Sequence, residues 1–127
     1  GLGLLDVDTI LEPTKQLRLE TATHAATGQS VFGYHMHMGV TSGPGRARPF
    51  CQIGAEDEGA VSPDGRVMGT YLHGLFAADG FRRAFLGNVA SPDLAYEAGI
   101  EATLDALAAH LETHLDIDAL LALAAEV

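Results

Sequence analysis

Six histidines and one cysteine are the side chains of this sequence that can exchange a proton near neutral pH or attack as a nucleophile. The best candidate among them is His73, in the run Gly-Thr-Tyr-Leu-His-Gly-Leu-Phe at residues 69–76. It follows a predicted strand at residues 66–72, and Gly74 breaks that strand at its carboxyl end. In open α/β sheets this end carries active-site groups. The pattern indicates a titratable group at a cleft rim, or alternatively a histidine that only hydrogen-bonds at a strand end.

Two pairs of histidines have spacings that suit a metal ion. His35 and His37 share one face of a predicted strand at residues 30–39, but no Asp, Glu or Cys lies close by in sequence to complete the ligand shell. His110 and His114 lie one helical turn apart, without the His-Glu-x-x-His order of zinc proteases. Metal binding by the first pair stays open as an alternative, and a solvated helix edge fits the second pair better. We expect no metal site.

The single cysteine does not have the surroundings of a nucleophile. Cys51 lies in Arg-Pro-Phe-Cys-Gln-Ile-Gly, which predicts a short strand and no strand-turn-helix elbow. A buried small hydrophobe is the better interpretation. The loop at residues 41–48 contains Arg46 and Arg48 and could hold an anion, but it has no phosphate-loop lysine and no following helix. A plain mobile loop fits it equally well.

The elements that must position these residues are strands in the first part of the chain. Residues 1–11 have the character of a buried segment that Pro13 ends. Alternation at residues 15–23 predicts a strand with Leu17, Leu19 and Thr21 on one face. Gly33, inside the strand at residues 30–39, indicates a bulge or a close backbone approach. Residues 56–59 read as an acidic turn, and residues 60–65 as a hairpin into the strand before His73.

Helices are predicted in the last part of the chain. Asp79 can cap a helix that runs to about Gly87. The run Ser-Pro-Asp at residues 91–93 can start a longer helix. Its apolar residues follow a three-four spacing that predicts one buried stripe: Ile100, Leu104, Leu107, Leu111 and Leu115. Asp116 caps a last short helix. Strands followed by helices suggest α+β, or the second half of a larger α/β domain.

Length, composition and charge exclude several classes of protein. The 127 residues suffice for one modest domain, and a hydrophobic fraction of 47% is enough to form a core. A formal charge of −10 disfavours binding to nucleic acid or to an anionic membrane. No transmembrane span or signal peptide is recognisable. One cysteine excludes an internal disulfide, which fits the cytoplasm. Because the first residue is Gly1, we expect a fragment or a processed product.

Several motifs occur in the order of a known family. They are Gly-Leu-Gly-Leu-Leu-Asp-Val-Asp-Thr at residues 1–9, Gly-Tyr-His-Met-His-Met-Gly at 33–39, Ala-Arg-Pro-Phe at 47–50, residues 65–76 around His73, and Phe-Arg-Arg-Ala-Phe-Leu at 81–86. Together with the C-terminal helices, they resemble the C-terminal glutamine amidotransferase domain of the cobyric acid synthase family. The resemblance implies the later part of a class I glutamine amidotransferase-like, flavodoxin-like α/β domain over residues 1–127.

The resemblance also implies a reaction. Such enzymes amidate carboxylates of a corrin a,c-diamide in cobalamin synthesis, with glutamine as the ammonia source. ATP and Mg²⁺ are implied for a synthetase domain that is missing from this chain, and no cofactor is expected within it. His73 matches the family's catalytic histidine, which works with a cysteine nucleophile. Tyr34, His37 and Gly39 match the Gly-Tyr-x-x-His-Met-Gly motif and are the expected binding residues.

Three departures from the family pattern matter. Leu75 stands where relatives with a full catalytic triad carry Glu, so His73 needs another means of orientation. His35 stands where the family usually has Glu. The cysteine elbow is absent, so no nucleophile is expected in this chain and the chain alone should be inactive. A partial domain should also expose apolar surface and a sheet edge, which predicts self-association.

Two other interpretations remain open from the sequence. The first is another amidotransferase of the same group, either cobyrinic acid a,c-diamide synthase or the amidotransferase partner of a cell-wall muropeptide ligase. The second is a non-catalytic binding module that keeps the fold without the nucleophile.

Overall fold

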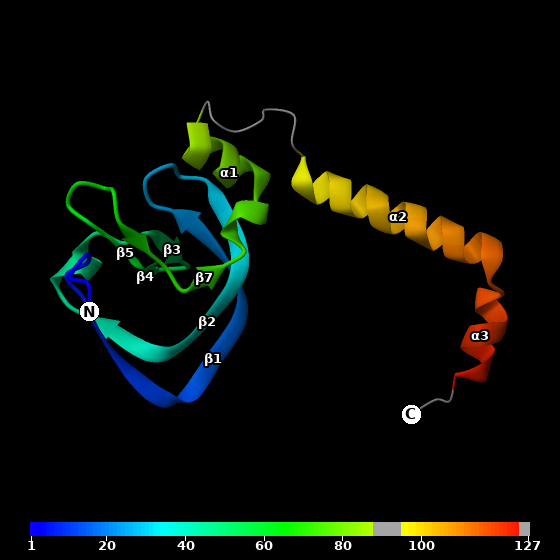
Figure 1. The fold of residues 1–127 in the computed structure, drawn as a ribbon, viewed down its shortest axis with the longest axis horizontal. Helices are drawn as coiled ribbons and strands as arrows, with labels where there is room; N and C mark the ends of the chain where they lie inside the picture. The colour runs from blue at the N-terminus through cyan, green and yellow to red at the C-terminus, as the bar shows by residue number, and fades with distance from the viewer. Residues whose placement is uncertain (88–94, 125–127) are drawn as a thin grey trace. The chain divides into compact units, whose positions relative to one another are not determined.

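The structure, a computed structural model, describes residues 1–87 and 95–124. The chain divides into two compact units, Gly1–Leu94 and Ala95–Val127, and each is described by itself. Unit 1 contains the strands, and the helices of unit 2 follow them in sequence (Figure 1). The mixed α/β class and the order of strands before helices are therefore as predicted.

Two long antiparallel strands form the frame of unit 1. Strand β1 spans Asp8–His24 and β2 spans Ser30–Ser42, with a turn that includes Gly28 between them. Both strands curve strongly and wrap around the smaller elements (Figure 1). The strands predicted at residues 15–23 and 30–39 lie within β1 and β2 and alternate as expected, but both are longer than predicted. Residues 8–11 do not form the expected buried segment: they lie in β1 and are exposed, because β1 continues through Pro13. The pairing register shifts between Leu11 and Gln16, and such an irregularity tolerates a residue without a backbone N–H.

Short strands complete a five-stranded sheet in the order β4-β3-β1-β2-β7. They are β3 (Cys51–Ile53), β4 (Glu56–Glu58) and β7 (Leu72–His73). A separate hairpin pairs β5 (Ala60–Val61) with β6 (Met68–Gly69), as the sequence predicted. The expected acidic turn at residues 56–59 is instead mostly strand, because β4 pairs with β3. The expected loop at 41–48 contains the end of β2 and a 3-10 helix, η1 (Pro44–Ala47).

The core of unit 1 lies on the concave side of the sheet. Its fully buried side chains include Val31, Cys51 and Phe81, and Leu72 and Phe50 pack with them. Phe81 comes from α1 (Asp79–Leu86), which follows η2 (Leu75–Ala77). The helix has the predicted bounds, but Ala78 and not Asp79 holds the N-cap position. Burial of the aromatic and aliphatic side chains anchors α1 beside the end of β7.

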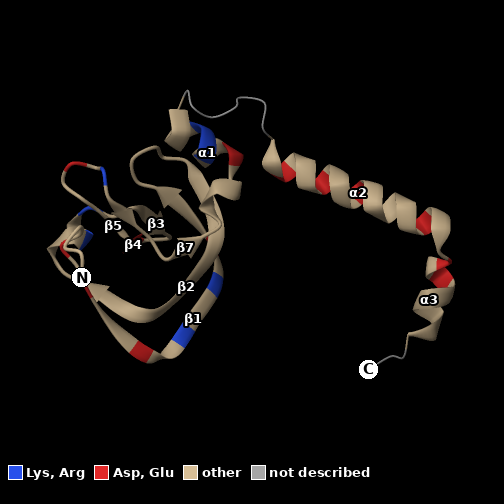
Figure 2. Cartoon of the chain, viewed as in Figure 1, with Lys and Arg blue, Asp and Glu red and all other residues tan. Residues whose placement is uncertain are grey.

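Unit 2 consists of two helices, α2 (Tyr96–His114) and α3 (Ile117–Leu123). Asp116 caps α3 as predicted, since its carboxylate accepts a hydrogen bond from the Ala119 N–H at 3.0 Å. The predicted start at residues 91–93 lies outside the described residues. The predicted buried stripe was wrong: no residue of α2 is buried. The described part of unit 2 carries acidic residues and no Lys or Arg (Figure 2).

Candidate functional site

His73 is the last residue of β7, and backbone pairing determines its position. Tyr34 lies opposite His73 and His35 lies opposite Leu72 in the antiparallel β2–β7 pair. Because side chains alternate along a strand, Leu72 enters the core, where it is 2% exposed, and His73 points to the other face and is exposed. Gly74, at φ 81, then turns the chain in the left-handed region that favours glycine.

The predicted continuous strand at residues 66–72 was wrong, and the break in it matters for His73. The chain leaves the β5–β6 hairpin at Gly69 and joins the large sheet at Leu72. Thr70 and Tyr71 connect the two sheets. The Thr70 hydroxyl and the Tyr71 N–H donate to a side chain from β4 and not to the backbone of a neighbouring strand. His73 is therefore positioned by a short crossing segment between two sheets.

Gly33 provides the close backbone approach that the sequence indicated. A Cβ at this position would overlap the backbone carbonyl of His73 and would come within 3.4 Å of the Leu72 side chain. The missing side chain lets β7 reach β2. This glycine therefore helps to place the candidate catalytic histidine without touching its ring.

The face that carries His73 is apolar and exposed. Tyr34 lies opposite His73, and the same face of β1 and β2 continues through exposed side chains: Leu17, Leu19, Phe32 and Met38. This face is opposite to the one that holds the core. Tyr34, an expected binding residue, thus lies beside His73 and away from the other two expected binding residues.

His37 and Gly39 lie at a cavity on the concave side of the sheet. The cavity has a volume of about 550 Å³, and its lining includes His35, His37, Gly39, Glu58 and Tyr71. His37 Nδ1 is 2.7 Å from the Gly39 carbonyl oxygen, and the His37 ring stacks on Tyr71 with 5.0 Å between centroids. The Tyr71 hydroxyl hydrogen-bonds with Thr41 Oγ1 at 2.7 Å. The structure brings these two predicted residues together but separates them from His73 by the sheet.

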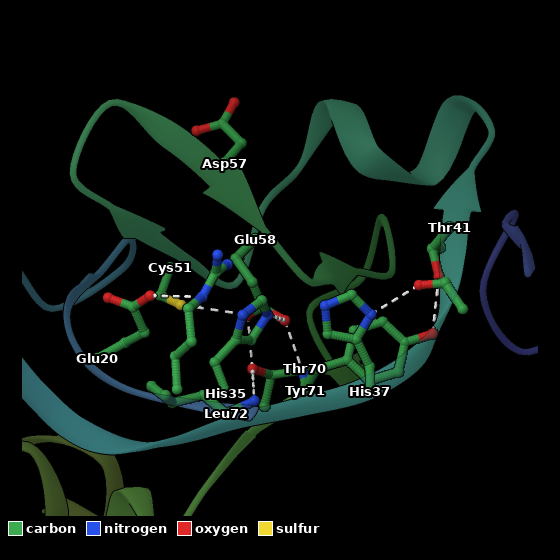
Figure 3. A network of polar contacts seen from close by, with 12 residues as sticks. Glu20, His35, His37, Thr41, Cys51, Asp57, Glu58, Thr70, Tyr71 and Leu72 are labelled. Carbon is green, nitrogen blue, oxygen red and sulfur yellow. Dashed lines mark hydrogen bonds and ion pairs between the residues drawn. The ribbon is translucent and has the colours of Figure 1, made fainter. Parts of the chain in front are cut away.

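Glu58 is the residue that the sequence reasoning missed. It ends β4 opposite Cys51, and its side chain is buried. Its carboxylate accepts hydrogen bonds from Thr70 Oγ1 at 2.6 Å, from the Tyr71 N–H at 2.7 Å and from Cys51 Sγ at 3.3 Å (Figure 3). Three acids stand together at residues 56–58, and nothing in the sequence distinguishes the one that is buried.

His35 lies next to this carboxylate. Its Nε2 is 3.8 Å from Glu58 Oε1, and its buried Nδ1 has no hydrogen-bond partner among the described residues. Burial lowers the pKa of His35, and the negative charge of Glu58 opposes that shift only in part. His35 is therefore an electrically neutral neighbour of Glu58 at neutral pH.

The environment of Cys51 disfavours the thiolate that a nucleophile needs. Its side chain is 0% exposed. Burial first, and then the charge and hydrogen bond of Glu58, raise the pKa of the thiol to about 12. The thiol therefore keeps its proton. The prediction of a buried, small and unreactive side chain agrees with this environment.

The predicted histidine pairs do not gather further ligands. In residues 1–87 and 95–124, no group of three or more His, Cys, Asp or Glu side chains is arranged to hold a metal ion. His35 and His37 have ring centroids 4.8 Å apart, and His110 and His114 have centroids 4.4 Å apart on α2. No helix in the part of the chain that the structure describes is both long enough and apolar enough to cross a membrane.

Comparisons with known proteins agree with the motifs around His73. A model of the CobB/CobQ-like glutamine amidotransferase domain matches residues 1–81. Cobyric acid synthases of Cereibacter sphaeroides and Bradyrhizobium diazoefficiens are 57% and 55% identical to this chain over 126 residues, and that of Paracoccus denitrificans is 58% identical over 125. Each alignment covers 98% of this chain but only 26% of the relative.

The chain thus spans about a quarter of the length of the curated relatives it matches. No solved structure shows a significant match to it. The resemblance found in the sequence is confirmed, and this chain belongs to the CobB/CobQ-like family of glutamine amidotransferase domains.

Proposed function

We propose that this chain is part of a cobyric acid synthase and supplies His73 as the histidine of its glutaminase site. Family membership and relatives of that name support the proposal. The observation that carries it is the presentation of His73: the residue ends β7, is exposed, and has its backbone fixed against Gly33. A general base needs this combination of a rigid backbone and an accessible ring.

In the proposed reaction, His73 works with a cysteine from a part of the longer protein outside these 127 residues. The imidazole takes the thiol proton, and the thiolate attacks the side-chain amide carbon of glutamine. The imidazolium then gives its proton to the leaving nitrogen, so ammonia departs and a thioester remains. Water hydrolyses the thioester to glutamate with the same imidazole as base.

The ammonia would then amidate a corrin a,c-diamide that ATP has activated. The activation step, with ATP and Mg²⁺, belongs in this proposal to another part of the longer protein. Cys51 takes no part, because its thiol is buried and donates its proton in a hydrogen bond to Glu58. The exposed apolar face around Tyr34 is where we expect the remaining part of the glutaminase site to pack.

The test separates the two ammonia sources in the full-length protein. We expect His73→Ala to lower glutamine-dependent amidation by about 10²- to 10⁴-fold and to spare turnover supported by added ammonia. His110→Ala, a change of a histidine on α2, is the matched control and should alter neither rate. Retention of glutamine-dependent amidation in His73→Ala would contradict the proposal.

A further inference from the structure

Glu58 is a buried carboxylate in unit 1 with an unusual set of partners. Among the described residues it is the only acidic side chain that is buried. An ionised carboxylate in such a place must be compensated by hydrogen bonds or by an opposite charge. His35, the partner that could supply a positive charge, is 3.8 Å away and has a lowered pKa. Compensation therefore comes mainly from hydrogen-bond donors.

Most of these donors belong to the two residues that connect β6 and β7. Glu58 Oε1 accepts from the Tyr71 N–H at 2.7 Å, and Oε2 accepts from Thr70 Oγ1 at 2.6 Å. The two oxygens thus hold successive residues of the crossing segment. Figure 3 shows the carboxylate beside Thr70 and Tyr71, with Leu72 next in the chain.

Two further hydrogen bonds extend this network toward His73. Thr70 Oγ1 accepts from the Leu72 N–H at 3.0 Å, and the Tyr71 carbonyl accepts from the Met36 N–H at 3.0 Å. The backbone is therefore fixed at three consecutive residues immediately before His73. The ring of His73 itself makes no hydrogen bond to another residue in the described part of the chain, and the side chain of Leu75 contains no acceptor. Its position depends on its backbone.

We propose that Glu58 is the positioning residue for His73 in the glutaminase reaction. It acts through Thr70, Tyr71 and Leu72 and does not touch the imidazole, which lies on the opposite face of the sheet. The inference rests on the proposed function, since it needs His73 to be the catalytic histidine. A small displacement of a catalytic group is costly: about 1 Å can lower a rate by about 10²-fold.

A positioning role and a merely structural role of Glu58 predict different kinetics. A structural role would lower glutamine-dependent kcat only in proportion to the folded fraction of unit 1. A positioning role lowers kcat with glutamine, leaves KM for glutamine nearly unchanged, and spares the rate with added ammonia. A fall in glutamine-dependent kcat that exceeds the loss of folded protein, followed by circular dichroism, therefore separates the two roles.

The experiment uses the full-length protein with three variants of this network and one control outside it. Glu58→Ala removes both hydrogen bonds from the crossing segment to the carboxylate, and we expect glutamine-dependent kcat to fall by about 10²-fold with the ammonia-dependent rate within about twofold of wild type. Thr70→Val removes one hydroxyl at nearly constant volume and should lower the same kcat by about tenfold, while Thr70→Ser restores it. Glu56→Gln changes an exposed acid on the same strand and is the control that should leave both rates unchanged.

His73→Ala is measured in parallel to separate the two proposals. If His73→Ala abolishes glutamine-dependent turnover but Glu58→Ala and Thr70→Val keep it, the positioning role is wrong and the proposed function stands. If His73→Ala keeps that turnover, the proposed function itself is wrong. Equal losses with glutamine and with ammonia would also overturn the positioning role. Should Glu58→Ala fail to fold, Thr70→Val and its rescue by Thr70→Ser decide the question.

Discussion

The backbone carbonyl of His73 occupies the space that a side chain on Gly33 would need. Gly33→Ala should therefore push β7 away from β2. We expect the free energy of unfolding to fall by about 1–3 kcal/mol, the usual cost of forcing extra volume into a packed site. Chemical denaturation followed by circular dichroism measures this change.

The matched control for that substitution is Gly99→Ala. A Cβ at Gly99 meets nothing within 4 Å, and the residue lies inside α2. Alanine favours a helix interior over glycine by roughly 0.5–1 kcal/mol, so this variant should be as stable as the parent or more stable. Equal stability of Gly33→Ala and the parent would show that β7 does not depend on the close approach.

The Cys51 thiol should resist modification in the folded protein. Its pKa of about 12 and its complete burial leave almost no accessible thiolate at pH 8. We expect a disulfide reagent to react at least roughly 10²-fold more slowly with the folded chain than with the chain in denaturant. Absorbance of the released thiolate follows the reaction.

The same experiment bears on the origin of the nucleophile. Cys51→Ser should leave no reactive thiol in the isolated chain and should keep the glutamine-dependent activity of the full-length protein. Rapid labelling of the folded chain would contradict the assigned environment. Glutaminase activity of the isolated chain that disappears in Cys51→Ala would contradict the proposed reaction.

Sequence reasoning found the elements whose signals are local. The alternation in β1 and β2 and the helix α1 depend on neighbours within a few residues, and both were predicted. The type of residue at Gly33 indicated a close backbone approach, but not that its partner is His73. Sequence reasoning failed where residues far apart in the chain determine the local structure. The break before β7 exists because Glu58 captures the Tyr71 N–H from 13 positions away in sequence, and no periodicity records such a bond.

The functional site divides in the same way. His73 could be proposed from the sequence because its motif is contiguous. The proposed role of Glu58 depends on a fold that brings β4 against the crossing segment, which the sequence does not reveal. The grouping of Tyr34 with His37 and Gly39 also followed sequence proximity. The strand alternation of β2 places Tyr34 on one face, and His37 and Gly39 on the other.

Mild acid should destabilise unit 1 through His24. This side chain is buried, with its ring packed 4.7 Å from Phe50 and 5.0 Å from Phe81, and burial lowers its pKa. Between the ordinary histidine pKa of about 6.5 and the lower folded pKa, the unfolded chain binds the proton and the folded chain does not. Stability is therefore complete above about pH 6.5 and falls as the pH decreases below it.

The measurement compares unfolding free energies at pH 7.5 and pH 5.5. We expect a smaller value at the lower pH, and a smaller difference between the two values in His24→Gln, whose amide can still reach Thr27 in place of the ring nitrogen. His35 contributes in the same direction, because its pKa is also lowered. If His24→Gln kept the full pH dependence of the parent, His24 would not be its source.

The exposed apolar face beside His73 should make the isolated chain self-associate. Leu19 and Phe32 are 58% and 48% exposed on this face, and β7 pairs with only two residues of β2. Unpaired strand edges and exposed apolar patches both promote association. Sedimentation velocity over a range of concentrations should show species larger than the 13.3 kDa monomer.

Substitutions on this face identify the surface responsible. Leu19→Ser with Phe32→Ser should shift the chain toward monomer, because both side chains are exposed and their removal creates no cavity in the core. Leu2→Ser changes an even more exposed leucine away from β1 and β2 and should leave association unchanged. A parent chain that sediments as a monomer at every concentration would show that this face does not drive association. Association that persists in Leu19→Ser with Phe32→Ser would assign it to another surface.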